Sequence, residues 1–162
     1  MSKMAERYKS VLVVDLFLTR NNNTNGKKEV LLSLRKNTGM NDGEYELPGG
    51  HVEENEDLMQ AMIREAKEEL DINLKNENLK IIHVLHHYTE GRLNFILSAN
   101  QYEGTLKINE PEKCERIEWF ELDKLPTNVT SKVKKSITEI TQNIFYDDIM
   151  FSKIKNKDKK QN

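Results

Sequence analysis

Three glutamates near the end of one predicted helix are the residues best suited to chemistry. Glu65, Glu68 and Glu69 stand at i, i+3 and i+4, a spacing at which like charges on a helix repel one another. The helix dipole also disfavours anions in the last turn. A sequence that breaks two local rules in one place is usually held there by function.

The angular positions of these glutamates place them on one arc of the helix. At 100° per residue, with Leu58 at zero, they fall between about 280° and 20°, and the small Ala61 lies on the same arc one turn earlier. The arc suits Mg²⁺, which prefers oxygen ligands and keeps room for waters and substrate phosphates. A Glu-rich solvated face is the competing interpretation. The predicted buried face comprises Leu58, Met59, Met62, Ile63, Ala66 and Leu70.

Arg64 lies beside Glu65 and one helical turn before Glu68. A guanidinium in this place can orient a catalytic carboxylate through charge-assisted hydrogen bonds, and an ordinary i,i+4 surface pair is the alternative. Glu56 lies nine residues before Glu65, about half a turn around the helix. We therefore expect Glu56 to stabilise the helix start and the preceding glycine loop.

The residues around the glutamates resemble the Nudix box, G-x5-E-x7-R-E-U-x-E-E-x-G-U, where U is aliphatic. LPGGHVE, residues 47–53, also resembles the family's lead-in, and EPEKCERIEWFELDKLP, residues 110–126, resembles the late strand and turn of MutT-type nucleotide hydrolases. Asp71 departs from the box, which has glycine there, so we expect altered geometry at the helix end with catalysis retained. The matching positions are Gly50, Glu56, Arg64, Glu65, Ala66, Glu68, Glu69 and Ile72.

The resemblance implies a metal-dependent hydrolase that cleaves a nucleoside diphosphate linked to another moiety. The MutT-type branch implies nucleoside triphosphates, oxidised ones among them, as substrates, with a nucleoside monophosphate and pyrophosphate as products. Mg²⁺ is the expected cofactor, and Mn²⁺ an expected substitute. ADP-ribose or another nucleotide conjugate is the alternative substrate, and a non-catalytic nucleotide-sensing domain is the alternative function. The Lys-rich residues 153–160 give weaker support to a capped RNA.

The box positions imply roles for individual residues. Glu68 and Glu69 are the leading metal ligands, and Glu65 is either a further ligand or the base that activates water. In relatives a carbonyl of the glycine loop can bind metal, so Gly50 is a candidate ligand, with an ordinary turn as the alternative. Arg64 is implied as the residue that orients a catalytic carboxylate.

Candidate site residues also lie outside the box. Many relatives recruit one more acidic ligand, and Glu112 and Glu115 are candidates, each of which could equally be a solvated loop residue. Asn128 follows a Leu-Pro turn where relatives place residues that contact the base. It is therefore a candidate for substrate binding.

A predicted strand carries further candidates for substrate binding. His86 and Tyr88 share one face of that strand, and His87 lies on the other face. These side chains could stack on a base or contact phosphate, although a histidine on a half-buried strand is more often structural. Cys114 has no identifiable catalytic partner, so we do not expect it to be a nucleophile.

Runs of β-branched and aromatic residues between turn signals predict the sheet that positions these groups. Strands are expected at 8–20, 28–36, 79–89, 93–104 and 117–122, with two short extended pieces around Pro48-Gly49-Gly50. The first two strands should form a hairpin, as should the pair around Gly91. Helices are expected from about 55 to 70 and over 131–146. The predicted class is α+β, and the Nudix resemblance implies a central mixed sheet sandwiched between helices.

Composition narrows the remaining choices. The length of 162 residues favours a single domain, expected over 1–150, with a polar Lys-rich tail at 151–162. The formal net charge of -2 argues against binding nucleic acid by bulk charge. No apolar run approaches the roughly 20 residues of a membrane span. A lone cysteine and the lack of a secretory signal favour the cytoplasm. The family resemblance implies a small nucleotide as the substrate, and the expected state of the protein is a monomer or homodimer.

Overall fold

The computed structural model describes residues 7–149 of the chain. The predicted tail at 151–162 lies outside the described residues. Eight strands form one mixed sheet in the order β3-β2-β1-β6-β5-β8, with β4 paired to β1 and β7 paired to β2. The strands are β1 (Val11–Asn21), β2 (Lys28–Arg35), β3 (Tyr45–Glu46), β4 (Gly49–His51), β5 (Lys80–His87), β6 (Arg92–Ala99), β7 (Cys114–Glu121) and β8 (Tyr146–Asp148).

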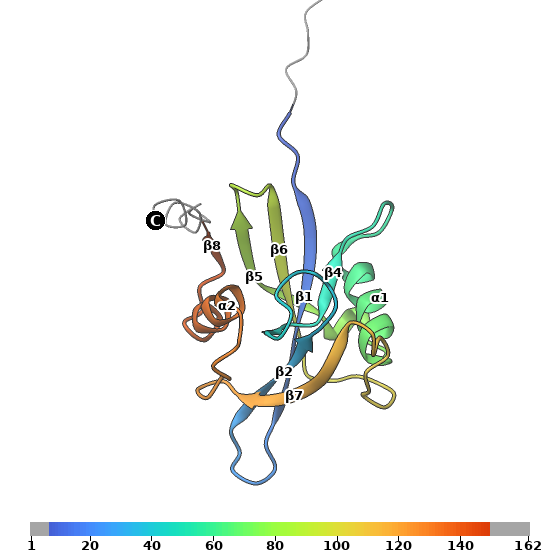
Figure 1. The fold of residues 1–162 in the computed structure, drawn as a ribbon, viewed down its shortest axis with the longest axis vertical. Helices are drawn as coiled ribbons and strands as arrows, with labels where there is room; N and C mark the ends of the chain where they lie inside the picture. The colour runs from blue at the N-terminus through green and yellow to red at the C-terminus, as the bar shows by residue number, and fades with distance from the viewer. Residues whose placement is uncertain (1–6, 150–162) are drawn as a thin grey trace, which may run out of the picture.

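Two α-helices cover opposite faces of the sheet (Figure 1). These are α1 (Leu58–Leu70) and α2 (Ser131–Thr141), and a short 3-10 turn, η1 (Asn76–Asn78), follows α1. Successive residues of a strand point to opposite faces. Accordingly Leu16 and Leu18 of β1 pack in the core under α1, while Phe17 packs in the core that contains Val133 and Ile137 of α2. The predicted α+β sandwich is confirmed.

Most predicted elements are present, and the hairpins 8–36 and 79–104 form as antiparallel pairs. The sheet is mixed because β1 runs parallel to β6. The second helix ends at Thr141 instead of continuing to residue 146, and the following segment supplies β8, which pairs in parallel with β5. The prediction of helix beyond Thr141 was wrong: Ile144, an apolar residue at helical spacing, lies outside the helix with 39% of its surface exposed.

The start of α1 also differs from the expected one. Asp57 is the N-cap, with its side chain accepting from the Gln60 N–H at 2.8 Å while Gln60 accepts from the Asp57 N–H. This capping box sets the first helical residue at Leu58. Asn55 has a positive φ of 67°, so Glu56 precedes the helix and no acidic residue lies in its first turn.

The end of α1 keeps the left-handed conformation that glycine usually provides. Asp71 has φ 54° and ψ 28°, and its N–H donates to the Lys67 carbonyl. The Asp71 carboxylate pairs with Lys67 at 2.5 Å and with Lys107 at 2.9 Å, and these pairs hold its pKa down at about 2. The expectation of an altered helix end was therefore wrong. Asp tolerates this conformation better than most residues.

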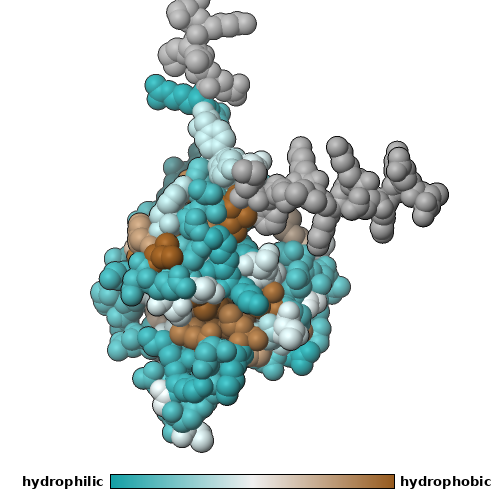
Figure 2. Space-filling view, turned by 90° about the vertical axis from the view of Figure 1, so that its left-hand side faces the viewer, coloured by the Kyte–Doolittle hydropathy of each residue, from teal (hydrophilic) through white to brown (hydrophobic). Residues whose placement is uncertain are grey.

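The surface on the α2 and β8 side is largely hydrophilic (Figure 2), with hydrophobic side chains gathered in a band across its middle. Within residues 7–149, no helix combines the length and the apolar character needed to cross a membrane.

Candidate active site

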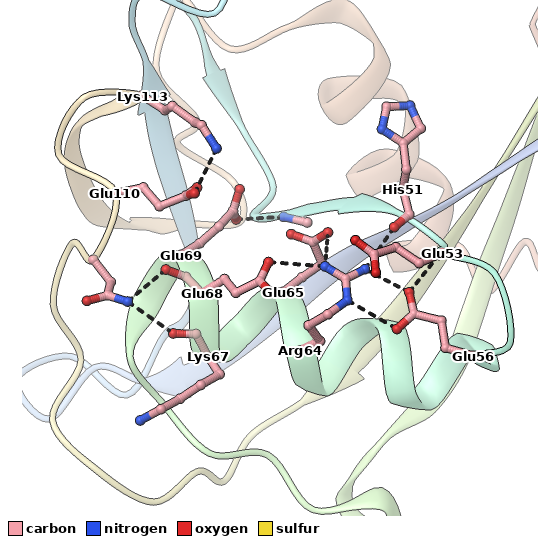
Figure 3. Close-up of polar contacts among 12 residues, drawn as sticks. His51, Glu53, Glu56, Arg64, Glu65, Lys67, Glu68, Glu69, Glu110 and Lys113 are labelled. Atoms are coloured by element: carbon pink, nitrogen blue, oxygen red, sulfur yellow. Dashed lines mark hydrogen bonds and ion pairs between the residues drawn. The ribbon is translucent and has the colours of Figure 1, made fainter.

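A pocket of about 950 Å³ opens where α1, β4 and the segment before β7 meet. Its volume is in the range of small-molecule sites. Glu65, Glu68 and Glu69 all line it, and so do both glycines of the 47–53 segment. The structure therefore brings the three glutamates and Arg64 together in one open site (Figure 3).

The carboxylate of Glu65 lies against the backbone of Gly50. A Cβ added at position 50 would stand 2.3 Å from Glu65 Oε1, so only glycine leaves the carboxylate where it is. The Glu65 side chain is 13% exposed, and this burial raises its pKa, while the adjacent Arg64 opposes the rise. Glu65 is thus a carboxylate held between a glycine and a guanidinium.

Among the three glutamates, Glu69 has the most strongly raised pKa. Its Oε2 accepts a hydrogen bond from the Gly49 N–H at 2.9 Å. Burial raises the pKa of Glu69 to about 8, and the negative charges of Glu65 and Glu110 add to the rise. The site therefore concentrates negative charge at a partly desolvated position, where a cation would be strongly attracted.

Arg64 joins the helix to the loop in front of it (Figure 3). Its Nη1 donates to Glu65 Oε1 at 2.8 Å and to Glu68 Oε2 at 3.1 Å. Its Nε and Nη2 donate to the two Glu56 oxygens at 3.1 and 2.7 Å, and Nη2 also reaches the His51 carbonyl at 2.9 Å. The orienting contact proposed for Arg64 is present, and Glu56 anchors the guanidinium.

Replacing Arg64 by Lys is expected to destabilise this arrangement. A single ammonium cannot reproduce a planar fork that serves four acceptor groups, and hydrogen bonds to charged groups contribute about 1.5–3 kcal/mol each. We expect a loss of about 2 kcal/mol in the free energy of unfolding and at least about a tenfold fall in kcat, measured by urea titration and steady-state kinetics. Lys67→Arg is the control on an exposed face, expected to behave as wild type. Wild-type stability and kcat in Arg64→Lys would disprove the role given to the Arg64 contacts.

The titration of Glu69 gives the protein without divalent cations a characteristic pH dependence. A carboxyl whose pKa is raised in the folded state contributes stability that is fully present below its ordinary pKa of 4.5 and is lost as the pH rises through about 8. The free energy of unfolding, measured by urea titration in chelator, should fall between pH 5 and pH 9, at most by about 1.4 kcal/mol per pH unit. In Glu69→Gln this slope should flatten. An unchanged slope would contradict the assignment.

The ladder between β1 and β4 argues against the Gly50 carbonyl as a metal ligand. Gly50 lies opposite Val14, and two residues further along the Val52 N–H donates to the Leu12 carbonyl at 3.0 Å. Hydrogen-bonded pairs alternate in an antiparallel ladder. The N–H and the carbonyl of Gly50 are therefore both hydrogen-bonded to the backbone of Val14. The Gly50 carbonyl therefore faces β1, whereas the Gly49 N–H donates to Glu69; a metal role for Gly50 stays a prediction that this geometry disfavours.

The acidic residue that the 110–126 segment brings to the pocket is Glu110. Neither Glu112 nor Glu115 lines the pocket, and Glu115 instead pairs with Arg116 at 3.5 Å. Glu110 lines it, and Lys113 binds Glu110 Oε1 at 2.7 Å. No sequence signal distinguishes Glu110, because its place depends on how the loop folds onto the end of α1.

The predicted substrate-binding residues do not line the pocket. Asn128 donates to the Gly43 carbonyl at 2.9 Å and so ties two loops together. His86 and Tyr88 make an edge contact with each other on the other face of β5, with ring centroids 6.0 Å apart. It is His87 that lines the pocket. The predicted alternation of His86 and His87 between the two faces is present, but the sequence did not reveal which face borders the pocket.

The carboxylates of the pocket can be compared with what the divalent cation implied by the resemblance requires of its ligands. Within residues 7–149, no three His, Cys, Asp or Glu side chains are gathered tightly enough to enclose an ion. The pocket nevertheless brings Glu65, Glu68, Glu69 and Glu110 together, and burial with the charges of Glu65 and Glu110 raises the pKa of Glu69. Mg²⁺ needs one or two carboxylates and takes further oxygens from water and phosphates. The residues therefore fit a hard cation in an open site.

The chain was compared with known proteins. It matches the family model for the NUDIX domain over residues 10–140. A MutT NUDIX hydrolase from Burkholderia pseudomallei has a TM-score of 0.69 and 26% identity, over 80% of this chain and 97% of that chain. A MutT protein from Methanosarcina mazei has a TM-score of 0.66 and 19% identity, over 85% and 97% of the two chains.

A further solved structure extends the comparison of folds. It is a bifunctional NMN adenylyltransferase/ADP ribose pyrophosphatase from Francisella tularensis, with a TM-score of 0.62 and 22% identity, over 86% of this chain and 43% of that chain. At such identities the Francisella and Methanosarcina structures show a shared fold alone.

The family model spans most of the chain, including the glutamates, the glycine loop and Arg64. The resemblance read from the box, with its MutT-type character, is confirmed. Enzymes of this family hydrolyse nucleoside diphosphate-linked compounds and generally use divalent metals. The chain belongs to the Nudix family of hydrolases.

Proposed function

We propose that the protein is a Mg²⁺-dependent pyrophosphohydrolase that converts nucleoside triphosphates, oxidised ones included, to nucleoside monophosphates and pyrophosphate. The observation that carries the proposal is the convergence of Glu65, Glu68, Glu69 and Glu110 in one pocket of about 950 Å³. The pocket has room for a nucleotide. A polyphosphate with bound cations is the ligand whose charge such a surface can accept.

Each residue of the acidic surface has a distinct part in the proposal. A bound divalent cation neutralises phosphate charge and makes water a better nucleophile. Glu68, Glu69 and Glu110 would hold such cations, and the Gly49 N–H keeps Glu69 in place at 2.9 Å. Glu65 takes the proton of the attacking water, because Gly50 and Arg64 fix its carboxylate more firmly than the exposed Glu68.

ADP-ribose or another nucleotide conjugate is the second candidate substrate. The Francisella structure is described as an ADP ribose pyrophosphatase complexed with AMP and a Mn ion, which supports both this alternative and Mn²⁺ as a substitute for Mg²⁺. A sensing role without turnover is disfavoured because the acidic positions of the box are all present.

The test is hydrolysis of a substrate panel with and without Mg²⁺. The panel contains normal and oxidised nucleoside triphosphates, ADP-ribose and dinucleoside polyphosphates, and products are identified by ion-exchange chromatography. Monophosphate and pyrophosphate from triphosphates is the expected result. Turnover of ADP-ribose alone would overturn the substrate and keep the chemistry. Tight binding of nucleotides with no turnover would support the sensing role and overturn the proposal.

A further inference from the structure

A second group of polar residues lines the same pocket and takes no part in the chemistry described above. It comprises Asp15 of β1, Glu46 of β3, Asn94 of β6 and Lys132 of α2, called here the Asp15 cluster. Because side chains alternate along β1, Asp15 points away from the α1 side that Val14 faces. These residues come from four elements that are distant in sequence. The fold therefore brings their side chains together in the pocket.

The cluster is unusually buried for its polarity. Exposed fractions are 5% for Asp15, 8% for Glu46 and 1% for Asn94. Buried carboxylates are costly unless partners compensate for the lost water. Lys132 Nζ lies 3.8 Å from Asp15 Oδ1 and 3.8 Å from Glu46 Oε1, which is too long for a hydrogen bond. Lys132 thus interacts with both carboxylates through charge alone, and Glu46 also lies 3.4 Å from Arg35 Nη1 and accepts a hydrogen bond from Asn41 Nδ2 at 3.0 Å.

The amide of Asn94 has a fixed orientation. The Asn94 Nδ2 donates to Asp15 Oδ2 at 2.6 Å, so the amide oxygen points away from this carboxyl group. Asn94 Oδ1 is then a buried acceptor, and among residues 7–149 it has no hydrogen-bond partner. Buried acceptors are nearly always satisfied in folded proteins. The cluster therefore offers acceptors on Asp15 and Asn94, and the Lys132 ammonium as a donor, to a ligand.

We propose, building on the proposed function, that the Asp15 cluster binds the nucleobase and selects bases that carry an exocyclic amino group. An amino group donates to the carboxylates and to Asn94 Oδ1. The ring nitrogen or carbonyl next to it accepts from Lys132. The phosphates are taken up by the acidic surface around Glu69 together with cations.

The hydrogen-bonding edges of the bases explain this selectivity. Adenine and cytosine present an amino donor at the position where hypoxanthine and uracil present a carbonyl acceptor. A carbonyl facing Asp15 or Glu46 meets lone pairs and leaves buried acceptors unsatisfied. Sites built to hydrogen-bond a donor reject analogues that lack it far more strongly than apolar pockets reject a change of size. The exocyclic amino group is therefore the group that the cluster recognises.

The experiment uses pairs of triphosphates that differ at the amino group. Hydrolysis and equilibrium binding are compared for CTP against UTP, ATP against ITP, and GTP against ITP, with the full-length protein in Mg²⁺. We expect the amino-bearing member of each pair to have a kcat/KM at least about tenfold higher. Equal values within all three pairs would overturn the inference.

Two substitutions within the cluster test whether it is responsible for the discrimination between bases. In Asp15→Asn the hydrogen bond from Asn94 can be kept while an acceptor and a charge are lost, and Glu46→Gln is the second variant should the first fail to fold. Both are expected to reduce the preference for CTP over UTP severalfold. The control is Glu90→Gln, which removes a charge from an exposed residue of the same pocket and should retain wild-type preference.

The outcomes separate this inference from the function on which it rests. Hydrolysis of triphosphates without discrimination would overturn the base selectivity and leave the proposed function standing. Absent hydrolysis together with preferential binding of the amino-bearing members would do the reverse. A change in preference for ATP over dATP in Asp15→Asn, with the preference for CTP over UTP unchanged, would show that the cluster binds the sugar and would overturn the inference.

Discussion

Replacing Glu68 by Gln is expected to lower kcat/KM by about 10²–10³-fold while the fold remains intact. The amide keeps the shape of the side chain but loses the charge through which a cation is held. The Glu68 side chain is 52% exposed and contacts Arg64 at 3.1 Å, so little packing depends on it. The measurements are steady-state hydrolysis of the best panel substrate and thermal unfolding, with the melting temperature expected to stay within a few degrees of wild type.

The matched control for this prediction is Glu54→Gln, an exposed glutamate that does not line the pocket. It should have wild-type activity, which separates a site effect from a general effect of charge. Glu65→Gln should lose at least as much activity as Glu68→Gln, because Glu65 is the proposed proton acceptor. Activity in Glu68→Gln above about a tenth of wild type would mean that the carboxylate is not a ligand.

Alanine at the two neighbouring glycines should have opposite consequences. At Gly49, with φ 152°, a Cβ would lie 2.0 Å from the Val14 carbonyl oxygen, so a backbone would have to move. We expect Gly49→Ala to cost about 3 kcal/mol or more in the free energy of unfolding, lowering the melting temperature by roughly 10 °C. At Gly50 the added Cβ meets the end of the Glu65 side chain, which can swing away.

Gly50→Ala should therefore fold with near wild-type stability and lose activity. A displacement of about 1 Å in a catalytic group can cost about 10²-fold in rate, and that is the loss we expect. Thermal unfolding and kinetics of both variants check the contrast. A stable, active Gly50→Ala would show that the position of Glu65 against this glycine is immaterial to catalysis.

The sequence predicted well what depends on local periodicity. The apolar face of α1 was identified, because a helical stripe that packs on a sheet repeats every three to four residues. The arc of glutamates followed from the same geometry. The start of the helix was misplaced by a few residues, since the Asp57 capping box competes with the acidic run before it. That error also concealed how Glu56 meets Arg64.

What could not be predicted depends on contacts between distant segments. Glu110 reaches the pocket because the preceding loop docks on the end of α1: the Asn109 N–H donates to the Glu69 carbonyl at 2.9 Å and the Lys107 N–H to the Leu70 carbonyl at 3.1 Å. No periodic pattern records such docking. The choice between His86 and His87 likewise required the pairing of β5 within the sheet, because alternation alone leaves both faces equivalent.

Direct binding of a divalent cation tests the central claim, that the carboxylates of this pocket hold the cation on which hydrolysis depends. The measurement is titration of the protein with Mn²⁺, following the free ion by electron paramagnetic resonance, for wild type, Glu68→Gln and Glu54→Gln. Wild type and Glu54→Gln should bind Mn²⁺ alike, and Glu68→Gln should bind it at least about tenfold more weakly. Equal binding by all three proteins would contradict the account.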